Sequence, residues 1–207
     1  MSKGSNTKQT ILDAAEYEFV NNSFGSAHTV NIAKRAGVTH AMLHYYFRTK
    51  EQLFETVLET KVSSMSRVLH FALEDTNEDF TTRFMRTVSS HFDFFAKNQN
   101  LCHFVLGVVN EESPFLPLLS KMMNRVKTKV MEGLKVEVQE AIDKGEIKEV
   151  DVASLMLDTI QFNMSAVFFY KKMQLLNINF YDSYEAYCAA RKAEIMGLIR
   201  LRLKKDN

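Results

Sequence analysis

Apolar residues recur at steps of three and four along most of the chain, a pattern typical of amphipathic helices. The first stripe runs from Thr7 to Asn22 and predicts a helix there. Asparagine, serine and glycine then break the period in the segment NNSFGSAH. A second helix is expected to begin at His28 or Thr29, with Ile32, Ala33 and Ala36 on its inner face.

The second helix is expected to end at Gly37, and the next two helices begin close behind it. A glycine in the left-handed conformation lets the chain reverse within a few residues, as a helix-turn-helix requires. Thr39 is a good N-cap for a third helix that reaches about Tyr46. Thr49, with Gln52 three residues later, has the spacing of a capping box at the start of a long fourth helix.

The rest of the chain also reads as helix. A polar stretch, residues 74–79, ends the fourth helix, and helices are expected over about 80–97, 118–143, 152–175 and 184–203, with a short segment near 100–111. Gly145 is a plausible residue to end the helix over 118–143. With only two prolines and seven glycines, the pattern predicts an all-α fold of about nine helices.

Composition places the chain among ordinary soluble proteins. It has 207 residues, of which 46% are hydrophobic and 25% charged. Cys102 and Cys188 lie far apart and outside any C-x-x-C arrangement, which favours a reducing compartment over a disulfide scaffold or a zinc finger. No signal-type apolar run and no uncharged apolar stretch of about 18 residues is seen, so a cytoplasmic protein without membrane association is expected.

The net charge of +1 conceals an asymmetry between the two ends of the chain. Residues 1–50 hold six lysines and arginines against three acidic residues, whereas the remainder holds 20 basic and 22 acidic residues. A positive N-terminal segment on an acidic body indicates that this end faces a polyanion.

Three segments carry a resemblance to a known family. The stretches ILDAAEYEF, IAKRAGV and LHYYFRTKEQLF closely resemble the TetR family of bacterial transcriptional regulators, over about residues 7–60. The resemblance implies a helix-turn-helix DNA-binding domain at residues 1–50. It also implies a ligand-binding and dimerisation domain at 51–207, joined to the first by the long helix. The function implied is that of a repressor released from double-stranded operator DNA by a small apolar or amphipathic effector.

The expected DNA contacts lie on and around the third helix, whose first turn would meet base edges. Tyr45 is included by the resemblance, and His44 stands where the family often has a phosphate-contacting tyrosine. Lys50, at the start of the fourth helix, can share a phosphate with free backbone N–H groups. For Thr29 and Thr39, helix capping is an equally good explanation. The full set is Thr29, Thr39, His40, Ala41, Met42, His44, Tyr45 and Lys50.

Sixteen phenylalanines and eleven methionines suit either core packing or an apolar effector cavity lined by helices. The candidates for the cavity are Phe92, Phe95, His103, Phe104, Met122, Phe162 and Phe169. Two half-sites on DNA require two-fold symmetry, so a homodimer through the last two helices is expected. The candidates for that interface are Leu155, Thr159, Phe162, Ala166, Ala189, Ala193, Met196 and Ile199.

Two other functions compete with DNA binding. His40 and His44 have the i, i+4 spacing of a helical metal site, which would suggest an all-α metal-dependent enzyme. The residue after the first histidine is Ala41 rather than the glutamate of zinc hydrolases, and no third ligand follows at a helical step. A helical interaction module without DNA binding is the other alternative. A regulator that is not an enzyme, without cofactor or metal, is the preferred interpretation.

Overall fold

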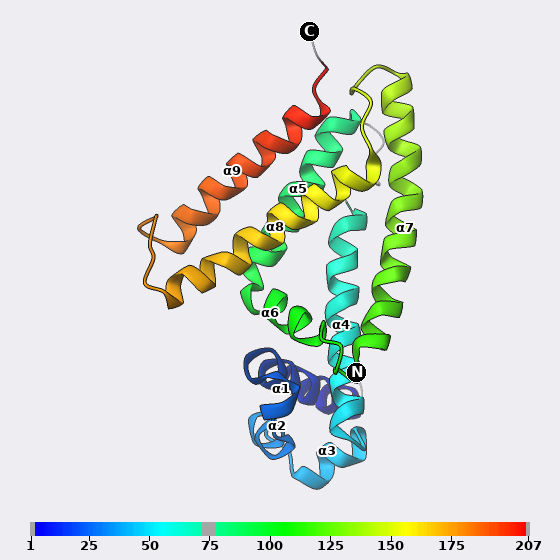
Figure 1. Ribbon diagram of the computed structural model, residues 1–207. Helices are drawn as coiled ribbons and strands as arrows, with labels where there is room; N and C mark the ends of the chain where they lie inside the picture. Colours follow the sequence, from blue (N-terminus) through cyan, green and yellow to red (C-terminus); the bar gives the residue numbers. More distant parts are fainter. Residues whose placement is uncertain (1–2, 72–77, 206–207) are drawn as a thin grey trace. The chain divides into compact units, whose positions relative to one another are not determined.

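The computed structural model describes residues 3–71 and 78–205, and the side chains of residues 6–68 and 78–205 (Figure 1). Within that part of the chain it contains helices and no strand. They are α1 (Lys3–Ser26), α2 (Thr29–Arg35), α3 (His40–Tyr46), α4 (Lys50–Phe71), α5 (Phe80–Lys97), α6 (Gln99–Val108), α7 (Leu116–Asp143), α8 (Val152–Leu175) and α9 (Tyr184–Leu203). The all-α prediction is confirmed.

The helix ends follow local chemistry that the sequence displays. The bounds of α5, α8 and α9 coincide with the predicted ones, and each begins after a capping side chain, Asp79, Asp151 or Ser183. Helix α7 begins two residues earlier than predicted, at Leu116. Pro117 then stands in the first turn, where its missing N–H costs nothing. The predicted break after α4 falls mostly on residues 72–77, which lie outside the described residues.

Helix α1 is not regular to its end. Ser23 has φ 60° and ψ 170°, so the helical backbone is interrupted inside the segment NNSFGSAH. The sequence predicts a break there. The few residues beyond Ser23 form a separate turn that leads to α2.

The chain divides into two compact units. Unit 1 comprises the residues up to Ser63 together with His103–Met123, and unit 2 comprises Ser64–Cys102 with the residues from Asn124 onward. The divisions fall inside α4, α6 and α7. The assignment of residues 1–50 as the DNA-binding domain stays a prediction about function, whereas the compact unit that contains them extends further.

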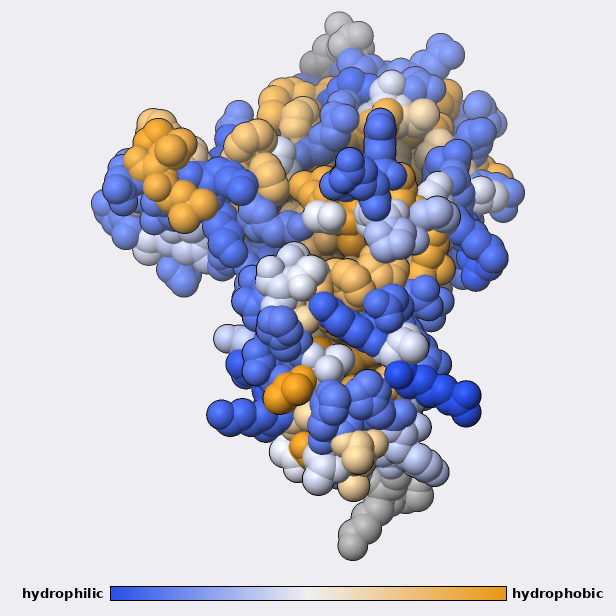
Figure 2. All heavy atoms as spheres, turned by 60° about the horizontal axis from the view of Figure 1, so that its bottom comes forward, coloured by the Kyte–Doolittle hydropathy of each residue, from blue (hydrophilic) through white to orange (hydrophobic). Residues whose placement is uncertain are grey.

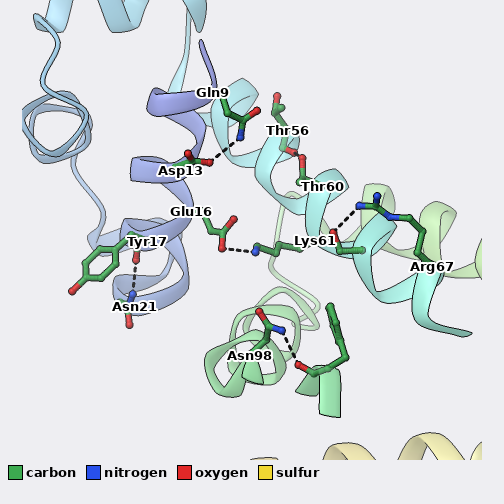
Figure 3. A network of polar contacts seen from close by, with 12 residues as sticks. Gln9, Asp13, Glu16, Tyr17, Asn21, Thr56, Thr60, Lys61, Arg67 and Asn98 are labelled. Atoms are coloured by element: carbon green, nitrogen blue, oxygen red, sulfur yellow. Dashed lines mark hydrogen bonds and ion pairs between the residues drawn. The ribbon is translucent and has the colours of Figure 1, made fainter. Parts of the chain in front are cut away.

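In unit 1, helices α1, α2, α3 and the first half of α4 enclose a small apolar core. Its innermost side chains come from all four helices: Ile11, Phe19, Ile32, Leu43, Leu53, Phe54 and Leu58 are at most 2% exposed. An ion pair between Glu16 on α1 and Lys61 on α4 closes one edge of this core, and the two side chains point toward each other in Figure 3.

In unit 2, helices α5, α8 and α9 pack side by side (Figure 1). The Tyr187 hydroxyl on α9 donates to the Ala166 carbonyl on α8 at 2.6 Å, and Lys192 pairs with Asp93 of α5 at 2.7 Å. By length and apolar composition alone α8 would pass as a membrane-spanning helix. A core helix of a soluble protein passes the same test, and Leu155 and Asn163 of α8 are both fully buried within unit 2.

Candidate nucleic-acid interface

The turn between α2 and α3 is fixed by Gly37. It has φ 67°, and its N–H donates to the Lys34 carbonyl at 3.2 Å while the Val38 N–H donates to the Ala33 carbonyl at 3.0 Å. This pair of bonds is a Schellman motif, which satisfies the last carbonyls of α2 and turns the chain sharply. The left-handed glycine predicted from the sequence is confirmed.

Thr39 caps the next helix. Its backbone is extended, and its hydroxyl accepts a hydrogen bond from the Met42 N–H at 3.1 Å. The capping explanation is therefore confirmed for Thr39, which leaves its side chain at the N-terminal edge of α3. Thr29 is different, because His28 occupies the N-cap of α2 and makes no side-chain capping bond.

Helix α3 has one buried and one exposed side. Leu43 and, just after the helix, Phe47 are 1% and 2% exposed and anchor α3 to the core of unit 1. The opposite side carries the predicted DNA-contacting residues: His40, Ala41, Met42, His44 and Tyr45 are all exposed, and Tyr45 is 81% exposed. A short helix with a solvent-exposed side held on a rigid core has the form needed to enter a major groove.

A chain of side-chain contacts crosses this surface. The Thr29 hydroxyl lies 2.9 Å from His40 Nε2, which lies 3.2 Å from His44 Nε2, and His44 Nδ1 lies 3.2 Å from the Arg48 carbonyl. A carbonyl only accepts, so His44 must donate from Nδ1 and, when neutral, accept at Nε2 from His40. These contacts fix the orientation of both imidazoles on the exposed side of α3. They also link α2, α3 and the turn that follows α3.

The start of α4 brings a lysine to the same unit. The Gln52 N–H donates to the Thr49 hydroxyl at 3.1 Å, but the Gln52 amide oxygen accepts from the Arg48 N–H rather than from Thr49, a variant of the predicted capping box. Lys50 is half-buried, with its Nζ 4.5 Å from the Phe24 ring centroid and 3.5 Å from the Gly25 carbonyl. An ammonium has three donors, so Lys50 can keep one of these contacts and still meet a phosphate.

Two cationic residues of unit 1, Lys34 and Arg48, are not among the DNA contacts predicted from the sequence. Lys34 and Arg48 are exposed, and no ion pair is found for either among the described residues. Their neighbour Arg35 is instead occupied, because its guanidinium stacks 3.5 Å over Tyr17 and its Nε donates to Glu18 at 3.3 Å. The motifs IAKRAGV and FRTK contain these basic residues, so the sequence indicates their positive charge. Only the structure shows that Arg35 is held by Tyr17 and Glu18 while Lys34 and Arg48 are exposed.

The imidazole pair was also the basis of the metal alternative. In the part of the chain that the structure describes, no group of three or more His, Cys, Asp or Glu side chains could hold a metal ion. His40 and His44 face each other at ring-centroid distance 4.4 Å and an interplanar angle of 87°. The metal alternative therefore rests on these two side chains alone.

The seven predicted effector residues are divided between the two units. Phe92 and Phe95 are fully buried in unit 2, where Phe162 packs partly buried and Phe169 is 57% exposed. His103, Phe104 and Met122 belong to unit 1. Only His103 and Phe104 line the cavity described there, which has a volume of about 620 Å³ and which Phe19, Phe24, Phe54 and Phe115 also line.

Unit 2 contains a buried polar pair near the predicted effector residues. Asn163 Nδ2 of α8 donates to His91 Nδ1 and to the Val88 carbonyl of α5, each at 3.0 Å. Burial lowers the pKa of His91 to about 4, so this imidazole is neutral at physiological pH. Burial also raises the pKa of the Cys102 thiol to about 12, which makes it unreactive.

The residues predicted for the dimer interface fall into two groups. Leu155, Thr159, Ala166 and Ile199 are buried inside unit 2 of a single chain, where a second copy cannot reach them. Ala189 and Ala193 are exposed, while Phe162 and Met196 are half-buried. The sequence periodicity alone did not distinguish the inner side of α8 and α9 from the outer one, because both sides carry small and apolar residues.

Comparison with known proteins gives consistent results. Residues 11–57 match the family model described as bacterial regulatory proteins, tetR family. A fatty acid metabolism regulator protein of Bacillus subtilis is 27% identical over 143 residues, which are 67% of this chain and 70% of the relative. The nucleoid occlusion factor SlmA of Marinobacter nauticus is 26% identical over 52% of this chain and 55% of its own length.

Solved structures share the whole fold. The transcriptional regulator FadR from Bacillus subtilis, in complex with stearoyl-CoA, aligns with a TM-score of 0.67 at 21% identity over 95% of this chain and 99% of its own. A TetR transcriptional regulator from Chloroflexus aurantiacus aligns with a TM-score of 0.75 at 17% identity over 100% of both chains. Together with the glycine turn, the exposed α3 and the lysine at the start of α4, the match over residues 11–57 identifies a DNA-binding region of the tetR type and supports a TetR family transcriptional regulator.

Proposed function

We propose that the protein acts as a homodimeric repressor that leaves its operator when a long-chain acyl effector binds. The observation that carries the DNA-binding part is the exposed side of α3, held between the Gly37 turn and the capped start of α4. Polar and small side chains there can contact base edges, while Lys50, Lys34 and Arg48 supply charge for phosphates.

The residues of α3 favour one mode of reading DNA. Its first turn has no arginine, asparagine or glutamine, the side chains that contact a base with two hydrogen bonds. Ala41 and Met42 can contact thymine methyl groups, and His40 can hydrogen-bond a purine. We therefore expect specificity to depend partly on the shape and deformability of the operator.

The effector class is inferred from the relatives. One is named a fatty acid metabolism regulator, and one solved neighbour holds stearoyl-CoA. Unit 2 offers a core rich in aromatic side chains, in which Phe92 and Phe95 lie beside the buried His91. An acyl chain that entered between these helices would displace side-chain contacts and shift the populations of two conformations. Effector and DNA would then oppose each other reciprocally.

The dimer is proposed through the outer sides of α8 and α9. Ala189, Ala193 and Gly197 are exposed on α9, with Leu198 and Leu201 beside them at 39% and 64% exposure. Small residues let a second copy of the helix approach closely, and the exposed leucines would be buried on association.

DNA binding and its release are tested on the full chain. A fluorescently labelled DNA fragment from upstream of its own gene should bind at low salt, and the logarithm of the affinity should fall linearly with the logarithm of salt concentration. Stearoyl-CoA should weaken binding, whereas free coenzyme A should not. DNA binding without any response to stearoyl-CoA would refute the effector class and leave the regulator intact. Failure to bind any fragment of its own genome would refute DNA binding.

The dimer is tested separately by sedimentation. Ala193→Glu places a charge on the exposed side of α9 and should give a monomeric mass at micromolar concentration. Val136→Glu is the matched control, because Val136 is 60% exposed on α7 and outside the proposed interface. A wild-type chain that sediments as a monomer would contradict the proposal.

A further inference from the structure

A cavity in unit 1 shares no lining residue with the proposed acyl site in unit 2. It has a volume of about 620 Å³, and its walls come from the C-terminal end of α1, α4, α6 and the α6–α7 loop. That volume lies within the range of cavities that bind drug-sized molecules, roughly 300–1,000 Å³. We propose that this cavity is a second effector site and that it takes a small aromatic cation.

The cavity has an aromatic wall built around Phe54. The Phe54 ring centroid lies 4.3 Å from that of Phe115, 5.1 Å from that of Phe24 and 5.4 Å from that of Phe104. Phe54 and Phe115 are only 2% and 4% exposed, so the surrounding core holds the rings in place. Preformed ring faces attract both flat apolar groups and cations.

The charge of the lining selects against anions. Among the described residues that line the cavity none is lysine or arginine, and Glu112 is the one carboxylate. Glu112 is exposed, and within the described residues its carboxylate makes no ion pair. Its backbone N–H donates to Asn110 Oδ1 at 3.1 Å, which holds the loop that presents it. A phosphate or carboxylate ligand would meet repulsion from Glu112, whereas an ammonium would find a counter-ion there. The Lys50 ammonium contacts Phe24 and Gly25 but is not itself part of the lining.

Amide and hydroxyl groups add hydrogen-bonding capacity beside the rings. Asn21, Asn22 and Ser113 line the cavity together with Ser23, whose φ of 60° is rare for a residue other than glycine. The same end of α1 contains Phe24 and Gly25, and the Lys50 ammonium contacts the Phe24 ring and the Gly25 carbonyl. A ligand in this cavity would therefore contact the segment that positions a predicted phosphate-binding lysine.

The binding test is calorimetric titration of the full chain with three ligands that share one ring system. They are 1-naphthylmethylammonium, the neutral 1-naphthalenemethanol and the anionic 1-naphthylacetate. The cation should bind saturably, with one site per chain and about tenfold more tightly than the anion at low salt. The preference should shrink as salt rises, because the carboxylate is exposed and screened.

Two variants locate the site. Gly107 lies on α6 and lines the cavity, and a Cβ at this position would meet nothing within 4 Å. Gly107→Leu should fill the cavity without displacing the core. The affinity for the cation should then fall at least about tenfold. Gly133→Leu is the matched control, because Gly133 is also helical with nothing within 4 Å but does not line the cavity.

The charge is tested by Glu112→Gln, which keeps the size of the side chain. The cation should then bind within about twofold of the neutral alcohol, while Glu111→Gln, a neighbouring exposed residue outside the lining, should leave the preference unchanged.

Three results would overturn the proposal: no saturable binding of the cation, equal affinity for all three ligands, or wild-type affinity in Gly107→Leu. Should Gly107→Leu fail to fold, the ligand series and Glu112→Gln still decide the question. Neither DNA nor acyl-CoA is present in these titrations. A failure of the cation to bind would therefore not contradict the proposed repressor function.

Discussion

His91 should make the stability of the protein depend on pH in a window that begins well above the pKa values of carboxylates. The imidazole is 3% exposed, and burial lowers its pKa from 6.5 to about 4. Its Nδ1 accepts from Asn163 Nδ2, whose other hydrogen bond goes to the Val88 carbonyl. That second bond fixes the amide orientation, so a proton on Nδ1 would face another donor. Protonation inside the fold is therefore costly.

The magnitude follows from the difference in pKa between the two states. Between pH 6.5 and about 4 the unfolded chain binds a proton at His91 that the folded chain does not. Stability therefore rises with pH in this window and is lost as pH falls through it. The difference between the pKa values of His91 in the unfolded and the folded chain corresponds to about 3 kcal/mol in the free energy of unfolding. The loss is complete near pH 4.

Urea unfolding at a fixed protein concentration measures this effect directly. His91→Gln keeps an acceptor for Asn163 but cannot titrate, so its free energy of unfolding should fall less than that of the wild type between about pH 7 and 4. Hydrogen bonds from Thr82 and Ser154 lower the pKa of Asp79 and Asp151 below 3.8, so these carboxylates act at lower pH and equally in both proteins.

A matched variant separates burial from the mere loss of a histidine. His28 is exposed, and His28→Gln is the control for the loss of a histidine as such. If the difference between wild type and His91→Gln were the same at every pH, the reasoning about His91 would be refuted.

Three further outcomes are expected. Lys50→Ala should weaken DNA binding similarly for all sequences and lower the salt slope by about one per chain in anisotropy titrations, whereas Lys144→Ala in unit 2 should not. His44→Tyr should retain most of the DNA affinity, because a tyrosine hydroxyl can also donate to a phosphate, whereas His44→Ala should weaken binding in the same titrations. Gly37→Ala should lower the melting temperature, since φ 67° costs an alanine about 1 kcal/mol, whereas Gly107→Ala in helical backbone should raise it.

Each of these has a contrary result. An unchanged salt slope in Lys50→Ala would remove that ammonium from the phosphate contacts. Wild-type affinity in His44→Ala would remove His44 from the DNA contacts. A melting temperature that fell equally in both glycine variants would show that space, rather than backbone conformation, limits these positions.

The apolar spacing and the capping residues determined the helices. The bounds of α5, α8 and α9 and the left-handed Gly37 and Gly145 were predictable because caps, glycine turns and periodicity act within a few residues. The exposed residues of α3 were predictable for the same reason, since Leu43 and Phe47 mark its inner side.

Tertiary packing decided everything that depends on which apolar side of a helix meets which neighbour. Leu155, Thr159, Ala166 and Ile199 share their spacing with an interface but lie in the core. The cavity in unit 1 joins Phe24, Phe54 and Phe115, which are separated by dozens of residues and show no local pattern.

Electrostatic contacts between elements were likewise decided in three dimensions. Arg35 is occupied by Tyr17 and Glu18, and Lys50 rests on Phe24, although each sits in a motif that reads as a free cation. Sequence spacing reports on the helix to which a residue belongs. Only the packed chain determines what lies opposite that residue, because long-range contacts depend on the summed geometry of many elements.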